Sequence, residues 1–76
     1  MENKKTRYFF AATMGYTINK NSIQFQNFMF KTNNGEFPSM KIIMDRSDKK
    51  DKNMKTEVIL SISEMSEKDF NEFNEN

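Results

Sequence analysis

The hydrophobic residues of positions 6–32 fall into two runs separated by a polar segment, a pattern typical of a β-hairpin. The first strand is predicted over residues 6–17, which are rich in aromatic residues and contain no proline. Residues 18–22 predict a turn, because asparagine tolerates the left-handed backbone conformation. The second strand is predicted over residues 23–32 and ends at the sequence Asn-Asn-Gly, a strong turn signal.

The two faces of the first predicted strand differ in bulk, because successive side chains of a strand point to opposite faces. The bulkier face carries Tyr8, Phe10, Ala12, Met14 and Tyr16. The other face carries Arg7, Phe9, Ala11, Thr13 and Gly15. We expect the bulkier face to form the core, since it offers more apolar surface for burial.

The hydrophobic pattern of the second strand changes phase near its middle. Ile23 and Phe25 share one face, whereas Phe28 and Phe30 share the other. A β-bulge near Asn27 would bring all four side chains to one face. A regular strand with both faces partly covered is the alternative.

Residues 38–48 fit an amphipathic helix with one buried stripe. Pro38 suits the first turn of a helix, and apolar residues then recur three and four positions apart. The polar residues that follow also favour this assignment. The alternation of Met40, Ile42 and Met44 leaves a third strand as the alternative.

Residues 57–63 give the clearest strand signal of the chain. Their continuous apolar run, Val58-Ile59-Leu60, predicts a central strand that is covered on both faces. Ser66 is predicted to begin a final helix that extends to Phe73. Asp69, three positions after Ser66, would complete a capping box.

The predicted order is strand, strand, helix, strand, helix. This order indicates an α+β fold, a small ββαβα domain with a three-stranded, mainly antiparallel sheet and helices on one face. A chain of 76 residues has room for one core, so we expect a single domain over residues 1–76. Residues 1–5 and 74–76 are expected to fray.

The composition narrows the chemistry that the chain can perform. It has no histidine, the commonest general base and metal ligand, and no cysteine. Asp45, Asp48 and Asp51 lack the glycine and the terminal glutamate of a calcium-binding loop. Glu64 and Glu67 flank a predicted helix start, so their side chains should diverge. We therefore expect no enzyme, no catalytic residue, no metal and no cofactor. No apolar run is long enough to cross a membrane, so we expect no membrane partner.

Charge is divided along the chain. Residues 1–56 carry eleven basic and five acidic side chains, a net charge of +6, whereas residues 57–76 carry one basic and six acidic side chains, a net charge of −5. Such polarity bears on partners rather than on fold. The acidic side chains predicted to dock into a basic groove of a partner are Glu64, Glu67, Asp69 and Glu72. The basic side chains predicted to contact nucleic acid are Lys4, Lys5, Arg7, Lys20 and Lys31. A solvated surface is the alternative for both groups.

Several short segments resemble small accessory proteins of phages and mobile elements. These are Tyr8-Phe9-Phe10, Gly35-Glu36-Phe37-Pro38-Ser39, Ser61-Ile62-Ser63-Glu64 and Ser66-Glu67-Lys68-Asp69-Phe70. The size, the charge polarity and the missing catalytic groups are also similar to those of anti-CRISPR and related anti-defence proteins. This resemblance implies a binding protein, cytoplasmic in the bacterial host, that blocks a CRISPR effector nuclease or its complex with guide RNA. It implies no catalytic residues.

Two other functions fit the same sequence. Aromatic residues interleaved with lysine suit a small accessory protein that binds single-stranded RNA or DNA, since bases stack on exposed rings while lysine neutralises phosphate. A homodimer is the other alternative, formed through the less bulky face of the first strand at Phe9 and Ala11.

Overall fold

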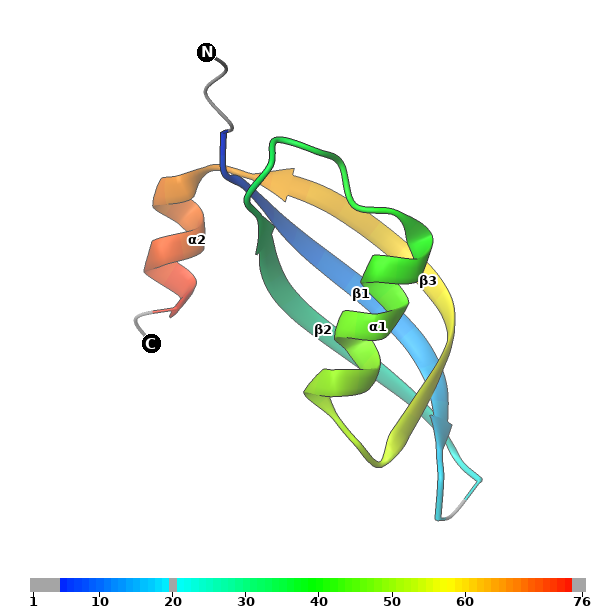
Figure 1. Ribbon diagram of the computed structural model, residues 1–76. Helices are drawn as coiled ribbons and strands as arrows, with labels where there is room; N and C mark the ends of the chain where they lie inside the picture. Colours follow the sequence, from blue (N-terminus) through cyan, green and yellow to red (C-terminus); the bar gives the residue numbers. More distant parts are fainter. Residues whose placement is uncertain (1–4, 20, 75–76) are drawn as a thin grey trace.

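In a computed structural model, the chain forms a three-stranded antiparallel sheet and two helices (Figure 1). The structure describes residues 5–19 and 21–74. The elements are β1 (Arg7–Thr17), β2 (Ile23–Thr32), α1 (Met40–Lys50), β3 (Met54–Met65) and α2 (Glu67–Asn74). The α+β class and the ββαβα order are therefore confirmed. Residues 1–4 and 75–76, where fraying was expected, lie outside the described residues.

The loops follow the local signals of the sequence. Asn21 has a φ of 57°, the left-handed conformation expected in the turn between β1 and β2. Residues 40–48 belong to α1, so the predicted helix is confirmed and the alternative third strand is wrong. The helix begins after Ser39, whose hydroxyl accepts a hydrogen bond from the Ile42 N–H at 3.2 Å. Pro38 thus precedes the cap instead of lying in the first turn. Ser66 caps α2 in the same way, accepting from the Asp69 N–H at 3.1 Å.

The strand order is β2-β1-β3, so β1 and not β3 is the central strand. The apolar run in β3 was wrongly expected to be covered on both faces, since Val58 and Leu60 are 41% and 51% exposed. Of the two alternatives for β2, the bulge near Asn27 is wrong and the regular strand is confirmed, because β2 pairs with β1 in one continuous register. The register shifts occur instead between β1 and β3.

The core lies on the face of β1 that we expected to be open. Phe9 and Ala11 are fully buried and pack with Phe28, Phe30 and Ile43, a residue of α1. Phe9 and Ala11 therefore cannot form the homodimer surface that the sequence suggested. The physical reason is distance: small side chains on this face let α1 lie close to the sheet, whereas a bulky face would hold a short helix away.

A buried hydroxyl network joins α1 to all three strands. The Ser47 hydroxyl on α1 accepts hydrogen bonds from the Thr56 hydroxyl at 2.6 Å and from the Gln26 side-chain amide at 3.0 Å. Its own hydrogen is thereby directed to the Thr13 hydroxyl, 2.8 Å away. Thr13 in turn donates to the Gln26 carbonyl at 3.3 Å. Every hydroxyl of this network is satisfied, as burial requires.

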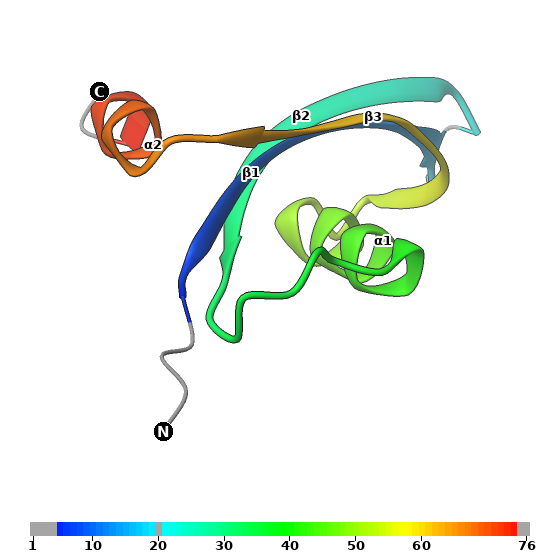
Figure 2. The same ribbon diagram turned by 90° about the horizontal axis from the view of Figure 1, so that it is seen from above.

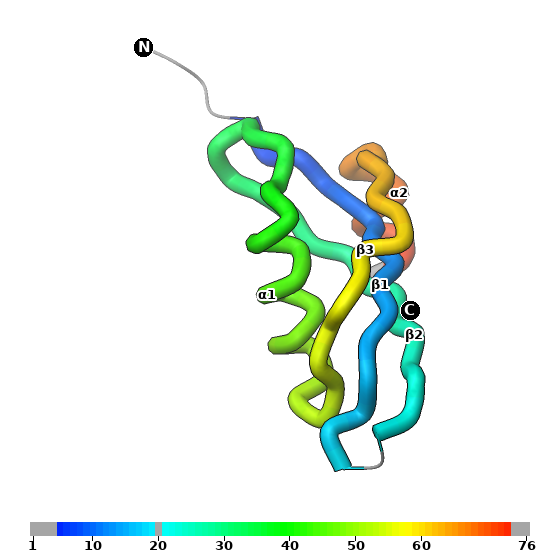
Figure 3. Tube along the Cα trace, turned by 90° about the vertical axis from the view of Figure 1, so that its right-hand side faces the viewer, coloured from blue at the N-terminus to red at the C-terminus, as the bar shows by residue number. Residues whose placement is uncertain are grey.

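The two helices lie on opposite sides of the sheet. The expectation that both helices cover the same face is therefore wrong for α2. Figure 2 shows that the sheet is curved and that α1 lies inside the curve, and Figure 3 shows α2 on the other side. The Phe70 ring of α2 contacts the Tyr8 ring, with 4.9 Å between their centroids. Tyr8 neighbours the buried Phe9 in β1, so its side chain points away from the core. Only one end of that face is therefore contacted by α2.

Candidate functional site

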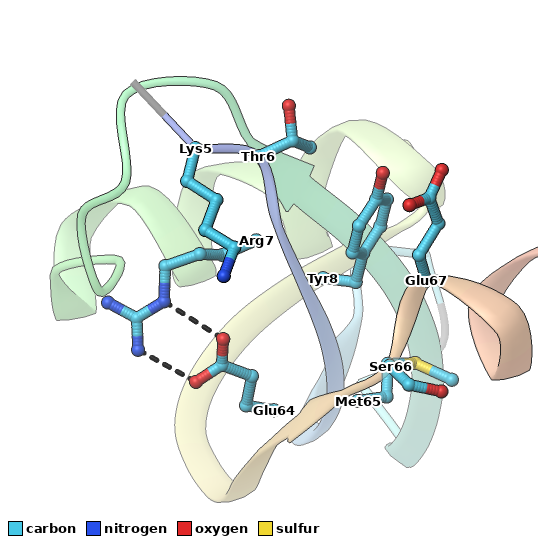
Figure 4. A pocket seen from close by; sticks show the side chains of 8 residues that line it. All are labelled: Lys5, Thr6, Arg7, Tyr8, Glu64, Met65, Ser66 and Glu67. Carbon is cyan, nitrogen blue, oxygen red and sulfur yellow. Dashed lines mark hydrogen bonds and ion pairs between the residues drawn. The ribbon is translucent and has the colours of Figure 1, made fainter. Parts of the chain in front are cut away.

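The start of β1 and the end of β3 meet at a corner of the molecule that brings together residues from both charged groups. We call Lys5, Arg7, Glu64 and Glu67 the charged corner. Figure 4 shows Lys5, Arg7 and Glu64 on one side of β1, with Glu67 beside Tyr8 on the other side. The basic and the acidic groups, which the sequence assigned to different partners, thus meet each other in the folded chain.

Arg7 and Glu64 form a two-point ion pair across this corner. Arg7 Nε and one terminal nitrogen donate to the two carboxylate oxygens of Glu64, at 2.9 and 2.7 Å (Figure 4). Such a fork is stronger and more directional than a single contact. Glu64 belongs to β3, whereas Glu67 is the first residue of α2.

Arg7 is also tied to the loop that leads into α1. Its second terminal nitrogen donates to the Gly35 carbonyl at 3.1 Å. Its guanidinium carbon lies 5.6 Å from the centre of the Phe9 ring and 5.9 Å from that of Phe37, within range of a cation–π contact. Arg7 therefore joins β1, β3 and the loop before α1, and its charge is already satisfied within the protein. This arrangement argues against its predicted role in binding phosphate.

The ion pair shifts the pKa of Glu64. The hydrogen bonds from Arg7 hold the pKa of the Glu64 carboxyl below its ordinary value of 4.5, with smaller contributions from the charges of Arg7 and Lys5 and with desolvation opposing them. On the other side of β1, the pKa of the Tyr8 phenol is raised, mainly by desolvation and then by the charge of Glu67 and a hydrogen bond to it. The lowered pKa keeps the Glu64 carboxyl ionised and paired with Arg7 at neutral pH.

A shallow pocket of about 370 Å³ lies at the charged corner, lined by residues 5–8 and 64–67. Sites for small molecules are mostly apolar, with a few polar groups free to orient the ligand. Here Arg7 and Glu64 already satisfy each other, so the pocket offers little to a small ligand.

The remaining predicted site residues lie apart from this pair. Glu67, Asp69 and Glu72 are exposed along α2, and Lys31 is exposed in β2. Lys4 and Lys20 lie outside the described residues. Among the described residues, the structure thus leaves the acidic side chains of α2 exposed along one helix.

The largest unassigned feature is the sheet face opposite α1. The strand registers place Met14 between Phe25 and Val58, Phe10 beside Met29, and Tyr16 beside Ile23, while Ala12 lies between Asn27 and Ser61. We call the apolar residues of this set, with Ala12, the open face. Their exposed fractions reach 60% at Ile23 and 67% at Phe25. A contiguous apolar patch on a small protein marks an interaction site, whereas scattered apolar residues do not.

Sequence reasoning missed the open face because it assigned the bulkier residues of β1 to the core. The sequence did contain a signal for the correct core face, since the small residues Ala11, Thr13 and Gly15 alternate along the other face. Gly15 shows why a larger side chain is excluded at that point of the face. A Cβ at this position would collide with the backbone carbonyl of Lys55, so β3 crosses β1 there in direct contact.

Within residues 5–19 and 21–74, no three acidic side chains gather closely enough to hold a metal ion. No helix in the same part of the chain has the length and hydrophobicity needed to cross a membrane. Comparisons with protein families, with curated proteins and with solved structures find no match to this chain.

Proposed function

We propose that this chain is a non-enzymatic binding protein that docks another protein on its open face. The observation that carries the proposal is the contiguous row of apolar side chains on all three strands, left uncovered by α1 and contacted by α2 only at one end. Burial of apolar surface is the main favourable term in most protein association.

The border of the open face suggests the chemistry of the partner. Exposed carboxylates of Glu67, Asp69 and Glu72 line α2, next to Tyr8 at one end of the face. Protein interfaces commonly have an apolar centre and a polar rim, and charge complementarity at the rim selects the partner. We therefore propose a partner that offers an apolar patch beside a basic groove. An RNA-guided nuclease of a bacterial defence system fits this description and agrees with the anti-defence resemblance of the sequence.

The mechanism we propose is steric inhibition. The open face would anchor the protein, while α2 would occupy basic residues that otherwise hold guide RNA or target DNA. Glu64 has no part in this contact, because Arg7 holds its carboxylate.

Nucleic-acid binding is the second candidate, and one observation favours it. Phe10, Tyr16 and Phe25 expose rings on the open face, and Lys31 and Lys55 lie beside Tyr8 and Tyr16 in the register. Exposed rings with neighbouring lysines can stack bases and neutralise phosphate. The exposed aliphatic residues on the same face favour protein docking instead, since they offer no stacking surface.

The two candidates separate in one set of experiments. Purified protein is added to a panel of RNA-guided nucleases, each loaded with guide RNA, and cleavage of target DNA is measured. We expect inhibition by the wild type and by Met40→Lys, a control on α1 where Met40 is 71% exposed, and loss of inhibition in Val58→Lys, where Val58 is 41% exposed on the open face. Equal inhibition by both variants would overturn docking through the open face.

Binding to plain single-stranded RNA is then measured at two salt concentrations. The docking proposal predicts no binding at either one. Strong binding at low salt that falls steeply as salt rises would support the nucleic-acid candidate, because phosphate contacts release counterions.

A further inference from the structure

The two outer edges of the sheet differ in a way that the proposed function does not explain. The β3 edge is irregular, with two register shifts, and it carries charged residues at Lys55, Glu57 and Glu64. Bulges and charges of this kind protect an edge strand from pairing with another chain. The β2 edge has neither protection: its register is continuous, it contains no proline, and its sole charged residue is Lys31.

Nothing in the described part of the chain pairs with the outer side of β2. The strand order places β2 at the edge, and α1 packs mainly against β3. Figure 1 shows β2 along one margin of the sheet. Its outward N–H and C=O groups therefore form an unused row of donors and acceptors.

We propose that a second copy of this chain pairs with β2 through its own β2 strand. The two strands would run antiparallel about a two-fold axis at Asn27, so that the two sheets join into one. In this register Asn27 faces the second copy's Asn27, Phe25 faces its Met29, and Ile23 faces its Lys31. Closed two-fold pairs of this kind are the commonest form of protein oligomer.

The side chains of β2 match one another in this register. The exposed ring of Phe25 meets a methionine, whose flexible thioether packs well against aromatic rings. The exposed Ile23 meets the aliphatic stem of Lys31, whose ammonium group can stay in water. Each contact occurs twice because of the two-fold axis. A register centred one residue later would instead place Phe25 against Lys31 and Met29 against Asn27.

The pairing would also change the open face. The open faces of the two copies would form one surface across both sheets, while the β3 edges stay at the outside. This inference does not depend on which protein docks there, since it uses Phe25 and Met29 of β2, whereas the docking test above uses Val58 of β3.

The mass of the protein in solution tests the pairing. Sedimentation equilibrium of the full chain should show a reversible monomer–dimer transition. Phe25→Lys should weaken the dimer by about tenfold or more, the factor that corresponds to 1.4 kcal/mol. Adding Met29→Glu should restore it, because each introduced lysine then faces a glutamate of the other copy. Val58→Lys, on the opposite edge, is the matched control and should leave the dimer unchanged.

The register has its own test, because the natural chain contains no cysteine. Asn27→Cys should cross-link to itself under mild oxidation. Ile23→Cys and Lys31→Cys should cross-link as a mixture and not separately. A wild-type protein that stays monomeric up to millimolar concentration would overturn the inference. A dimer that is unaffected by Phe25→Lys would also overturn it. So would β2 backbone amides that become protected from hydrogen exchange only when a different protein is added.

Discussion

Arg7 and Glu64 face each other across neighbouring strands, with their side chains 2.7 Å apart at the closest atoms. One belongs to the basic part of the chain and the other to the acidic part. The fold therefore uses some of the charge division to join the start of β1 to the end of β3. Charge counted along a sequence cannot distinguish a surface for partners from a contact within the protein.

Replacing Arg7 tests this structural role. Arg7→Ala should lower the melting temperature, and Arg7→Lys should recover only part of the loss. Lysine keeps the charge but cannot bond both carboxylate oxygens and the Gly35 carbonyl in the same geometry. Thermal unfolding by circular dichroism measures the effect, with Arg46→Lys as a control on α1. Full recovery by Arg7→Lys would show that charge alone matters at this position.

The pH dependence of stability follows from the lowered pKa of Glu64. A carboxyl whose pKa is lower in the folded state stabilises the protein above its unfolded value and loses this effect as the pH falls through the folded value. The difference in melting temperature between the wild type and Glu64→Gln should thus be largest near neutral pH. It should shrink as the pH falls below the ordinary value of 4.5. High salt at neutral pH should also reduce it, since the pair is partly exposed. A difference that stays constant from pH 7 to pH 3 would contradict the ion pair.

The reversal of the two faces of β1 gives the sharpest stability contrast. Phe9→Ala should cost about 3–5 kcal/mol of unfolding free energy, because Phe9 is fully buried in the core. Phe10→Ala should cost much less, since Phe10 is 38% exposed on the open face. Urea denaturation of the two variants measures both values. Equal losses, or a larger loss at Phe10, would contradict the buried position of Phe9 and favour the original expectation that the bulkier face of β1 forms the core.

Replacing Ser47 tests the buried hydroxyl network. Ser47→Ala should lower the free energy of unfolding by about 2 kcal/mol, because the buried Thr13 and Thr56 hydroxyls and the Gln26 amide each lose a hydrogen-bond partner. Ser61→Ala is the control, since Ser61 is exposed and should change stability by less than about 0.5 kcal/mol. Denaturant unfolding compares the two variants. A neutral Ser47→Ala would mean that the network contributes little to holding α1 on the sheet.

Gly15→Ala should destabilise the protein by about 1–3 kcal/mol, since the added methyl group meets the Lys55 backbone and not a flexible side chain. Gly35→Ala tests a different cause. Gly35 has a φ of 75°, so alanine there should cost about 1 kcal/mol through backbone strain alone. Only Gly15→Ala should shift the amide resonances at the contact between β1 and β3. If both variants shift them equally, β3 is not in close contact with β1 at Gly15.

Local signals predicted the elements of the fold well. Asn21 in the hairpin turn and Ser66 before α2 each act through their immediate neighbours, so the sequence alone locates them. Which face of β1 is buried depends instead on how closely α1 and β3 approach. That distance is decided by Gly15 and Ser47, which are far apart in the sequence.

The candidate site was less predictable for a related reason. The charges of Arg7 and Glu64 could be read from the sequence but their pairing could not, because these residues are separated by most of the chain. The open face was hidden because a row of apolar residues has the same sequence pattern whether a helix or a partner covers it. The position of α1 decides between the two, and it is a property of the folded chain.

The most direct test of docking through the open face is a capture experiment with three tagged proteins: the wild type, Val58→Lys and Met40→Lys. Each is incubated with bacterial lysate, with and without RNase, and the retained proteins are identified by mass spectrometry. Docking through the open face predicts that the wild type and Met40→Lys retain the same nuclease subunit after RNase treatment and that Val58→Lys loses it. Retention by all three proteins, or only RNA-binding proteins that disappear with RNase, would contradict it.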